Sequence, residues 1–438
     1  MTLRRFHLTL SLAAVLTGTA QAQSLAQLYE AAKGYDANFK SAQSQYQANL
    51  AKAEQAKALL RPTAGLSANL SEADYNNQLN AAGDARFGTR TATLSASHPL
   101  FRPANSASYR QGLKQADLAQ AQLKAAEQDL IVRVSQAYFD VLAAQESLAF
   151  VQAQKAAVSE QLAAAKRNFE VGTSTITDTR EAQARFDLVT AQEIAADNDL
   201  RVKKLALDQS VGTANAQPIA IKPGAQLAPI ENADVQTWVQ QASAQNPGIA
   251  QARIGLEVAQ LETEKAKAGH MPTLDLTASY GATRYRNGNL TSRIDNNTGT
   301  IGLSFNLPLY AGHATHNRIQ ETVALEEKAR NDLDVAQRNV AQGTRTAFFG
   351  VQSGLGQVKA LEAAEASSQS ALDANKLGYQ VGVRINIDVL NSQSQLFQTK
   401  RDLAKARYDV LLGQLKLSQA AGVLKFEDLQ NINNLLQK

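Results

Sequence analysis

Two histidines, His313 and His316, have the type and spacing of a metal-binding pair. Imidazoles three residues apart on a helix can bind one metal ion, but a stable site needs further ligands. The chain contains no cysteine, and no carboxylate cluster lies near the pair in the sequence. We therefore interpret both histidines as part of a strand-to-helix junction and predict no metal and no other cofactor.

The remaining chemistry-bearing residues do not form a catalytic set. No arrangement along the chain resembles a nucleophile, a base and an acid in sequence. The glycine-rich stretch 350–356 lacks the Lys-Ser/Thr pair of a phosphate-binding loop, and it lies inside a helical pattern. These glycines are expected to allow close helix packing, and the chain is not predicted to be an enzyme.

Charged and polar residues follow two glycines that stand in similar positions. Arg384, Asp388 and Asn391 are spaced by four and three residues, which places them on one face of a helix. In a symmetric oligomer each of them would become a ring. Asp178 follows the earlier glycine, Gly172. Taken alone, Asp178 and Arg384 are better interpreted as ordinary turn or capping residues, because Asp is common near helix starts. Helix capping is the alternative for Asp388 as well.

The elements that position these residues occur twice. Short motifs recur 210 residues later (272 − 62 and 388 − 178): Pro62-Thr63 as Pro272-Thr273, Tyr138-Phe139 as Phe348-Phe349, Val171-Gly172 as Val381-Gly382, and Asp178 as Asp388. A constant offset over most of the chain indicates two copies of one structural unit. We therefore predict two structural repeats in each chain.

Composition favours long thin helices over a globular core. The 438 residues are 44% hydrophobic but only 6% aromatic, and Ala and Gln are abundant. Small residues allow helices to pack closely without a thick apolar interior. An extended helical body is expected.

The first residues have the pattern of an export signal. Arg4 and Arg5 precede an apolar stretch at 8–16 and the small-x-small sequence at 20–22, so we predict a signal peptide over 1–22. Its removal takes away two arginines and lowers the formal charge from +4 to +2, so no nucleic-acid partner is predicted. No later apolar run reaches about 18 residues, so any membrane insertion requires β-strands. Without cysteine there is no lipidated anchor, which leaves the periplasm, the exterior or the outer membrane.

Proline spacing marks the helices. No proline occurs between Pro103 and Pro218 or after Pro308, and proline breaks helix interiors. Apolar residues in the first stretch recur at helical spacing, which predicts a helix over about 105–169, roughly 100 Å long at about 1.5 Å per residue. Each half is expected to hold a long helical hairpin, with its tip at about 171–178 or 381–388. The glycine at each tip suits the positive φ that often ends a helix.

The segments before these hairpins alternate with a period of two. Residues 273–280 and 300–309 alternate clearly, and 64–70 and 92–100 do so more weakly. We predict strand hairpins at about 62–101 and 272–310, with loops at about 72–90 and 284–298. Four strands cannot close a barrel in lipid, so the chain must oligomerise, and three copies would give about twelve strands and a lumen. The alternative is an ordinary soluble sheet with one solvent-facing side.

Several runs of the sequence carry a resemblance to a known family: Gly269–Ser279, Gly302–Tyr310, Gly378–Leu390, Ala406–Tyr408 and Phe426–Leu429. Together these runs resemble the TolC family. The similarity covers nearly all of the mature chain and is most specific in the second half. It implies a mixed α+β membrane protein: a homotrimer with a 12-stranded β-barrel in the outer membrane, continued by a long periplasmic α-helical barrel. The first repeat would span 23–212, an equatorial linker 213–245, and the second repeat 246–438.

The resemblance also implies roles for residues at the hairpin tips. Asp178 on the first hairpin is similar to the acidic partner of a periplasmic gate, and Tyr379 and Arg384 resemble its partners on the second. Asp388 matches one of two acidic constriction rings, and Asn391 stands where the family has the second acid. A single charged ring therefore implies a pore that prefers cations but is blocked less strongly by trivalent cations than a family member with two acidic rings.

The tip residues themselves resemble an adaptor contact. They are Val171, Gly172, Val381 and Gly382. The equal alternative is that the two glycines serve turn geometry only.

The function implied is an exit duct for type I protein secretion, multidrug efflux or both. Its expected partners are a periplasmic adaptor protein, an inner-membrane ABC or resistance-nodulation-division (RND) transporter, and outer-membrane lipid. The principal alternative is a non-conducting periplasmic coiled-coil scaffold or adaptor, which would have one helical hairpin and an inner-membrane anchor. The exported substrate is not predicted.

Overall fold

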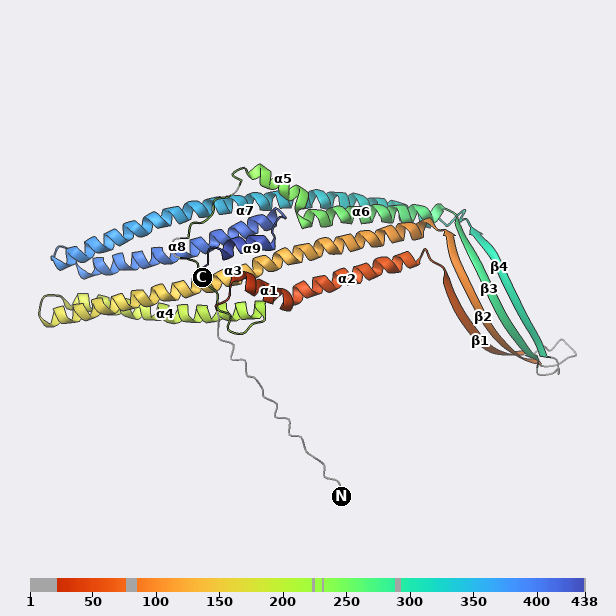
Figure 1. The fold of residues 1–438 in the computed structure, drawn as a ribbon, viewed down its shortest axis with the longest axis horizontal. Coiled ribbons are helices and arrows are strands. Elements are labelled where there is room, and N and C mark those ends of the chain that lie inside the picture. Colours follow the sequence, from red (N-terminus) through yellow and green to blue (C-terminus); the bar gives the residue numbers. More distant parts are fainter. Residues whose placement is uncertain (1–21, 76–84, 223–224, 231, 288–292, 437–438) are drawn as a thin grey trace, which may run out of the picture.

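The computed structural model describes residues 22–75, 85–222, 225–230, 232–287 and 293–436. The predicted signal peptide lies outside these residues except for Ala22. The molecule is elongated, with a four-stranded sheet at one end and the tips of two helical hairpins at the other (Figure 1).

The elements in chain order are α1 (Leu25–Tyr35), α2 (Ala37–Ala58), β1 (Thr63–Tyr75), β2 (Ala85–Phe101), α3 (Pro103–Glu170), α4 (Ile176–Val211), α5 (Val235–Gln245), α6 (Pro247–Lys267), the short 3-10 helix η1 (Ala268–His270), β3 (Thr273–Asn287), β4 (Arg293–Asn306), α7 (Ala314–Gln380), α8 (Asn386–Ala420) and α9 (Phe426–Asn433).

The two-repeat architecture is confirmed by these bounds. α5 begins and ends 210 residues after α1 (235 − 25 and 245 − 35), and α7 ends 210 residues after α3 (380 − 170). The order helix, strand hairpin, long helical hairpin is the same in both halves, and the two long hairpins lie side by side (Figure 1). No helix in the described part of the chain combines the length and the hydropathy of a membrane span.

The sheet joins the repeats. Its order is β1-β2-β3-β4, all antiparallel, and β2 of the first repeat pairs with β3 of the second. The predicted loops were too long, because the ladders continue to Tyr75 and Ala85 in one hairpin and to Arg286 and Arg293 in the other. Backbone pairing does not require the apolar alternation used for the prediction. β4 ends at Asn306, before Pro308, which has no N–H to donate.

The two faces of the sheet differ in polarity. Leu66, Leu70, Ile301, Leu303 and Phe305 lie on the apolar face, and Leu66 and Ile301 are 76% and 77% exposed. Ser, Thr and Gly residues alternate with them on the other face. So large an exposed apolar surface is typical of a face that meets lipid or another protein.

The main core lies midway along the molecule, where α1, α3, α8 and α9 meet. The Tyr138 hydroxyl donates to the Ile219 carbonyl at 2.8 Å, and the Phe139 ring stacks on Tyr408 with centroids 5.7 Å apart. The Tyr408 hydroxyl donates to the Glu146 carboxylate at 2.5 Å. Desolvation by burial, together with the Glu146 charge, raises the pKa of Tyr408 well above its ordinary value.

Away from this core the helices pack as thin pairs. A Cβ at Gly354 would lie 2.8 Å from Val410 Cγ2, so this glycine allows α7 to approach α8 closely. The expectation of close packing is therefore confirmed at Gly354, whereas Cβ atoms at Gly350 and Gly356 would meet nothing within 4 Å.

Candidate functional site

Both hairpin tips have the same backbone. Gly172 and Gly382 have φ of +79° and +80°, as expected for glycine at a helix end. The Thr173 N–H donates to the Asn168 carbonyl at 2.8 Å, and the Val383 N–H donates to the Gly378 carbonyl at 2.9 Å. The glycines thus serve the turn geometry.

The valines beside the two glycines leave an apolar surface at the tips. Val171 and Val381 are 73% and 65% exposed. Of the four residues predicted to contact an adaptor, these two therefore present side chains to solvent.

The structure places Asp178 in the cap of its own helix. Its carboxylate accepts hydrogen bonds from the Thr175 N–H at 2.9 Å, the Thr175 hydroxyl at 2.8 Å and the Ser174 hydroxyl at 2.7 Å. The Thr175 hydroxyl in turn accepts from the Asp178 N–H, which completes a capping box. The Thr175 N–H, followed by the Ser174 hydroxyl, lowers the pKa of Asp178.

Tyr379 and Arg384 lie on the second hairpin, as predicted, but neither bonds to Asp178 within the single chain. The Asn168 amide of the first hairpin donates to the Tyr379 hydroxyl at 3.2 Å. The Arg384 guanidinium lies 3.7 Å from the Asp388 carboxylate on its own helix. Asn168 is therefore a tip residue that sequence reasoning missed. Its contact with Tyr379 crosses between the repeats, where helical periodicity gives no information.

The predicted constriction residues lie on α8, one turn apart. Asp388 faces Arg384, while the Asn391 side-chain carbonyl accepts a 2.7 Å hydrogen bond from Arg185 on α4. Arg185 was also missed. A signal was present, because Arg185 follows Asp178 by seven residues and thus lies near the same face of its helix.

At the opposite end of the helices, an ion pair links the repeats. Arg102, between β2 and α3, donates to both carboxylate oxygens of Asp275 on β3, at 2.7 and 2.5 Å. Asp275 is only 7% exposed. This bidentate pair connects the start of the first long helix to the strand of the second repeat.

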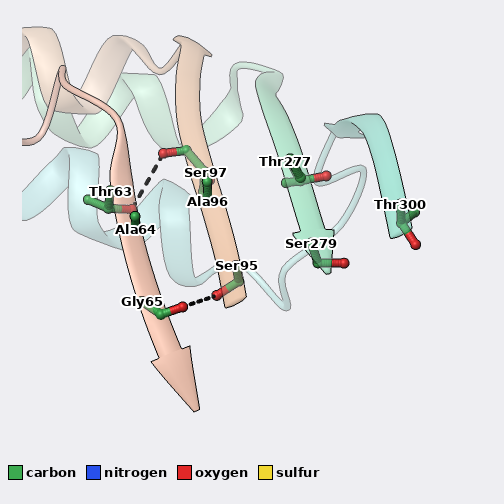
Figure 2. A pocket seen from close by; sticks show the side chains of 10 residues that line it. Thr63, Ala64, Gly65, Ser95, Ala96, Ser97, Thr277, Ser279 and Thr300 are labelled. Carbon is green, nitrogen blue, oxygen red and sulfur yellow. Dashed lines mark hydrogen bonds between the residues drawn. The ribbon is translucent and has the colours of Figure 1, made fainter. Parts of the chain in front are cut away.

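The polar face of the sheet contains a shallow hollow of about 480 Å³, shown in Figure 2. Small and hydroxyl residues from all four strands line it, among them Thr63, Ser95, Thr277 and Thr300, and none of its lining residues is titratable. The Ser95 hydroxyl donates to the Gly65 carbonyl at 3.4 Å. The lining of this hollow is therefore polar and holds no acid–base group.

The predicted junction histidines are close together. The rings of His313 and His316 lie 6.3 Å apart in an edge-to-face arrangement, and Tyr310 stacks edge-on against His313. Within the described ranges, no group of three or more His, Asp or Glu side chains is arranged to hold a metal ion.

Sequence comparison connects this architecture to known proteins. The family model described as "Outer membrane efflux protein" matches residues 28–213 and 238–423. The second match begins and ends 210 residues after the first (238 − 28 and 423 − 213), the same offset that separates the repeats.

Individual relatives agree with this match. The chain is 33% identical over 420 residues to the outer membrane protein TolC of Vibrio cholerae serotype O1, with 95% of each chain covered. It is 32% identical over 351 residues to the alkaline protease secretion protein AprF of Pseudomonas aeruginosa, covering 79% of this chain and 72% of that one.

A solved structure has the same fold. The outer membrane protein VceC of Vibrio cholerae superposes with a TM-score of 0.79 at 20% identity, covering 91% of this chain and 96% of that one. The comparisons lend no support to a non-conducting periplasmic scaffold. The chain belongs to the outer membrane efflux protein family, as a TolC homologue located in the outer membrane and extending into the periplasm.

Proposed function

We propose that three copies of this outer-membrane channel protein close their sheets into one twelve-stranded barrel and their hairpins into one periplasmic tunnel. The observation that carries this proposal is the sheet itself, which exposes a long apolar face and leaves one edge each of β1 and β4 without a strand partner among the described residues. Open edges cannot remain in lipid, because each unpaired backbone group costs several kcal/mol, commonly about 4 or more.

The unequal burial of the two long helices supports assembly. α3 buries twenty of its 68 residues, whereas α7 buries only seven of 67. The two helices are nearly equal in length and occupy the same position in their repeats, so they should bury similar surfaces. The open surface of α7 is therefore suited to packing against neighbouring copies.

The tunnel would serve as the exit duct of a type I secretion or efflux machine. A periplasmic adaptor and an inner-membrane transporter, of the ABC or the RND class, would complete the machine. The relative AprF, a protease secretion protein, favours type I secretion.

The periplasmic end would be closed by Asp178, Tyr379 and Arg384. The Asn168–Tyr379 bond holds the two tips of one copy together. The Arg384 side chain is 58% exposed and only loosely paired at 3.7 Å, so it is free to meet Asp178 of a neighbouring copy. An exposed pair of this kind contributes about 0–1 kcal/mol, so a docking adaptor could break it.

Single-channel conductance in planar bilayers tests this gate. The wild type should show a small conductance, and the double variant Arg384→Ser, Tyr379→Phe should raise it several-fold. Arg338→Ser is a matched control, because Arg338 is an exposed α7 arginine paired within its own helix. Unchanged conductance in the double variant would place the gate elsewhere, and the absence of channels from assembled trimers would refute the duct.

Asp388 would form the charged ring of the constriction, with Asn391 as a neutral ring beside it. One acidic ring should bind trivalent cations less tightly than two, because attraction rises with the local charge.

The adaptor contact would be formed at the hairpin tips, by Val171, Gly172, Val381 and Gly382. Replacing either glycine with a bulky residue should abolish export but leave trimers intact, and loss of the trimer would instead indicate a structural role.

A further inference from the structure

Arg185 on α4 bonds to Asn391 on α8, and so brings a positive charge to the proposed constriction. Its Nη2 lies 2.7 Å from the Asn391 side-chain oxygen, although the two residues are 206 positions apart. Asn391 is exposed and Arg185 is half-buried. Any solvent-filled space that Asn391 faces therefore lies next to the Arg185 guanidinium as well.

No described carboxylate forms an ion pair with Arg185. Within the described part of the chain, no ion pair of 4.0 Å or less includes Arg185. The two acidic residues nearest to Arg185 along α4 are Glu181, one turn earlier, and Asp187. Glu181 forms no ion pair with Arg185, and the Asp187 carboxylate accepts a 2.9 Å hydrogen bond from Gln183. A guanidinium remains protonated at any physiological pH, so this charge is permanent.

The surroundings of Arg185 are also basic. A cleft of about 380 Å³ between the two hairpins is lined by Arg185, Asn391, Arg401 and several glutamines, and its lining includes no Asp or Glu. The Arg401 guanidinium donates to the Gln398 side chain on its own helix. A concave site with charges of one sign concentrates counter-ions, here anions.

We infer that Arg185 is a charge-selectivity determinant of the duct, which offsets the Asp388 ring and lowers its preference for cations in favour of anionic permeants. The inference rests on the proposed constriction at Asp388 and Asn391. In a trimer, Arg185 would form a positive ring directly beside Asn391, while Arg384 already lies 3.7 Å from Asp388. At this level the Arg185 ring would then offset the negative charge of the Asp388 ring.

Reversal potentials measured in bilayers under a KCl gradient test the inference. Arg185→Gln should increase the ratio of potassium to chloride permeability several-fold, and Arg185→Lys should stay near the wild type because it keeps the charge. Arg180→Gln is the matched control, since Arg180 is an exposed arginine of α4 that does not line the cleft. A shift in Arg185→Gln no larger than in Arg180→Gln would overturn the inference.

A double-mutant cycle separates charge from packing. Asn391→Asp should raise cation preference in the wild type about as much as Arg185→Gln does, because the new carboxylate neutralises the Arg185 charge. In the Arg185→Gln background the new carboxylate has no cationic partner, so the same change should strongly increase block by a trivalent cation such as hexaamminecobalt(III), whereas block should change little when Arg185 is present. Equal changes in block in both backgrounds would show that Arg185 does not act at this position.

Asp388→Asn separates failure of this inference from failure of the proposed function. If Asp388→Asn lowers cation preference and Arg185→Gln has no effect, the constriction stands and the role of Arg185 is refuted. If well-assembled trimers conduct but neither substitution changes selectivity, both the constriction and the inference are refuted.

Discussion

At the first hairpin tip the side chains of Thr175 and Asp178 cap the start of α4, whereas Ile385 and Asp388 occupy the same repeat positions at the second tip without a side-chain cap. The backbone turns are nearly identical, with φ of +79° at Gly172 and +80° at Gly382. Repetition in the sequence thus reproduced the turn but not the side-chain contacts that stabilise it.

The second tip also holds a buried amide without a partner. Asn386 is 2% exposed, and neither its side-chain nitrogen nor its oxygen bonds to another described residue. Its counterpart in the first repeat is the half-exposed Ile176. A buried unpaired polar group is destabilising, so the second tip should open more readily than the first. This fits a gate that moves mainly through the second hairpin.

The largest expected effect is at Asn386. Asn386→Val removes the unpaired amide and should stabilise the second hairpin by about 1–3 kcal/mol. Hydrogen exchange of the 380–390 segment, measured in assembled trimers, should slow. Ile176→Val, at the matching position of the first hairpin, should change exchange little. Faster exchange in Asn386→Val would mean that ordered water satisfies the amide.

The next effect is the loss of the Asp178 cap. Asp178→Ala should destabilise the first hairpin by about 1–2 kcal/mol, because it removes all three bonds to the carboxylate. Asp388→Ala, in the second repeat, should cost less than about 1 kcal/mol, since it removes only a partly exposed ion pair. Thermal unfolding and hydrogen exchange of each tip would measure the difference. Equal costs would show that the two tips are held alike.

The same cap makes the first tip sensitive to acid. The pKa of Asp178 is lowered in the folded chain, so its contribution is complete above the unfolded pKa of about 3.9 and is lost as the pH falls through the folded pKa. Because the chain has no native cysteine, a spin label at Thr173 can report the mobility of this tip alone. Mobility should rise on acidification, and Asp178→Asn should remove most of that rise.

The turn glycines should behave alike, which tests the similarity of the two tips. Gly172→Ala and Gly382→Ala each force a side chain into the left-handed region, at a cost of about 1 kcal/mol. Nothing lies within 4 Å of a Cβ at either position, so no clash adds to this strain. Stability measurements on the two variants should agree, and a clear difference would reveal a contact specific to one tip.

The smallest effect is an exchange of the capping residues. Ile385→Thr should supply the missing cap, with Asp388 already at the third helical position, and stabilise α8 by about 0.5–1 kcal/mol. Thr175→Ile should destabilise α4 by a similar amount. Channel opening should become rarer in Ile385→Thr. An unchanged open probability would separate helix capping from gating.

The sequence predicted the helices and strands well but gave little information about the contacts between them. The helix predicted over 105–169 is α3, at Pro103–Glu170, because helical periodicity and proline are local signals. The loops predicted at 72–90 and 284–298 were too long, since 72–75, 85–90, 284–287 and 293–298 are strand. Cross-strand pairing holds polar residues in the ladder there.

By itself, the sequence determined the repeat, the helical hairpins, the tip glycines and the membership of a channel family. Each of these follows from local spacing or from motifs that recur at a constant offset. Only the tertiary structure decided that Asp178 caps its own helix, that Asn168 meets Tyr379, and that Arg185 stands beside Asn391. The last two contacts join helices of different repeats. The rotation of these helices relative to one another depends on packing between residues more than 200 positions apart.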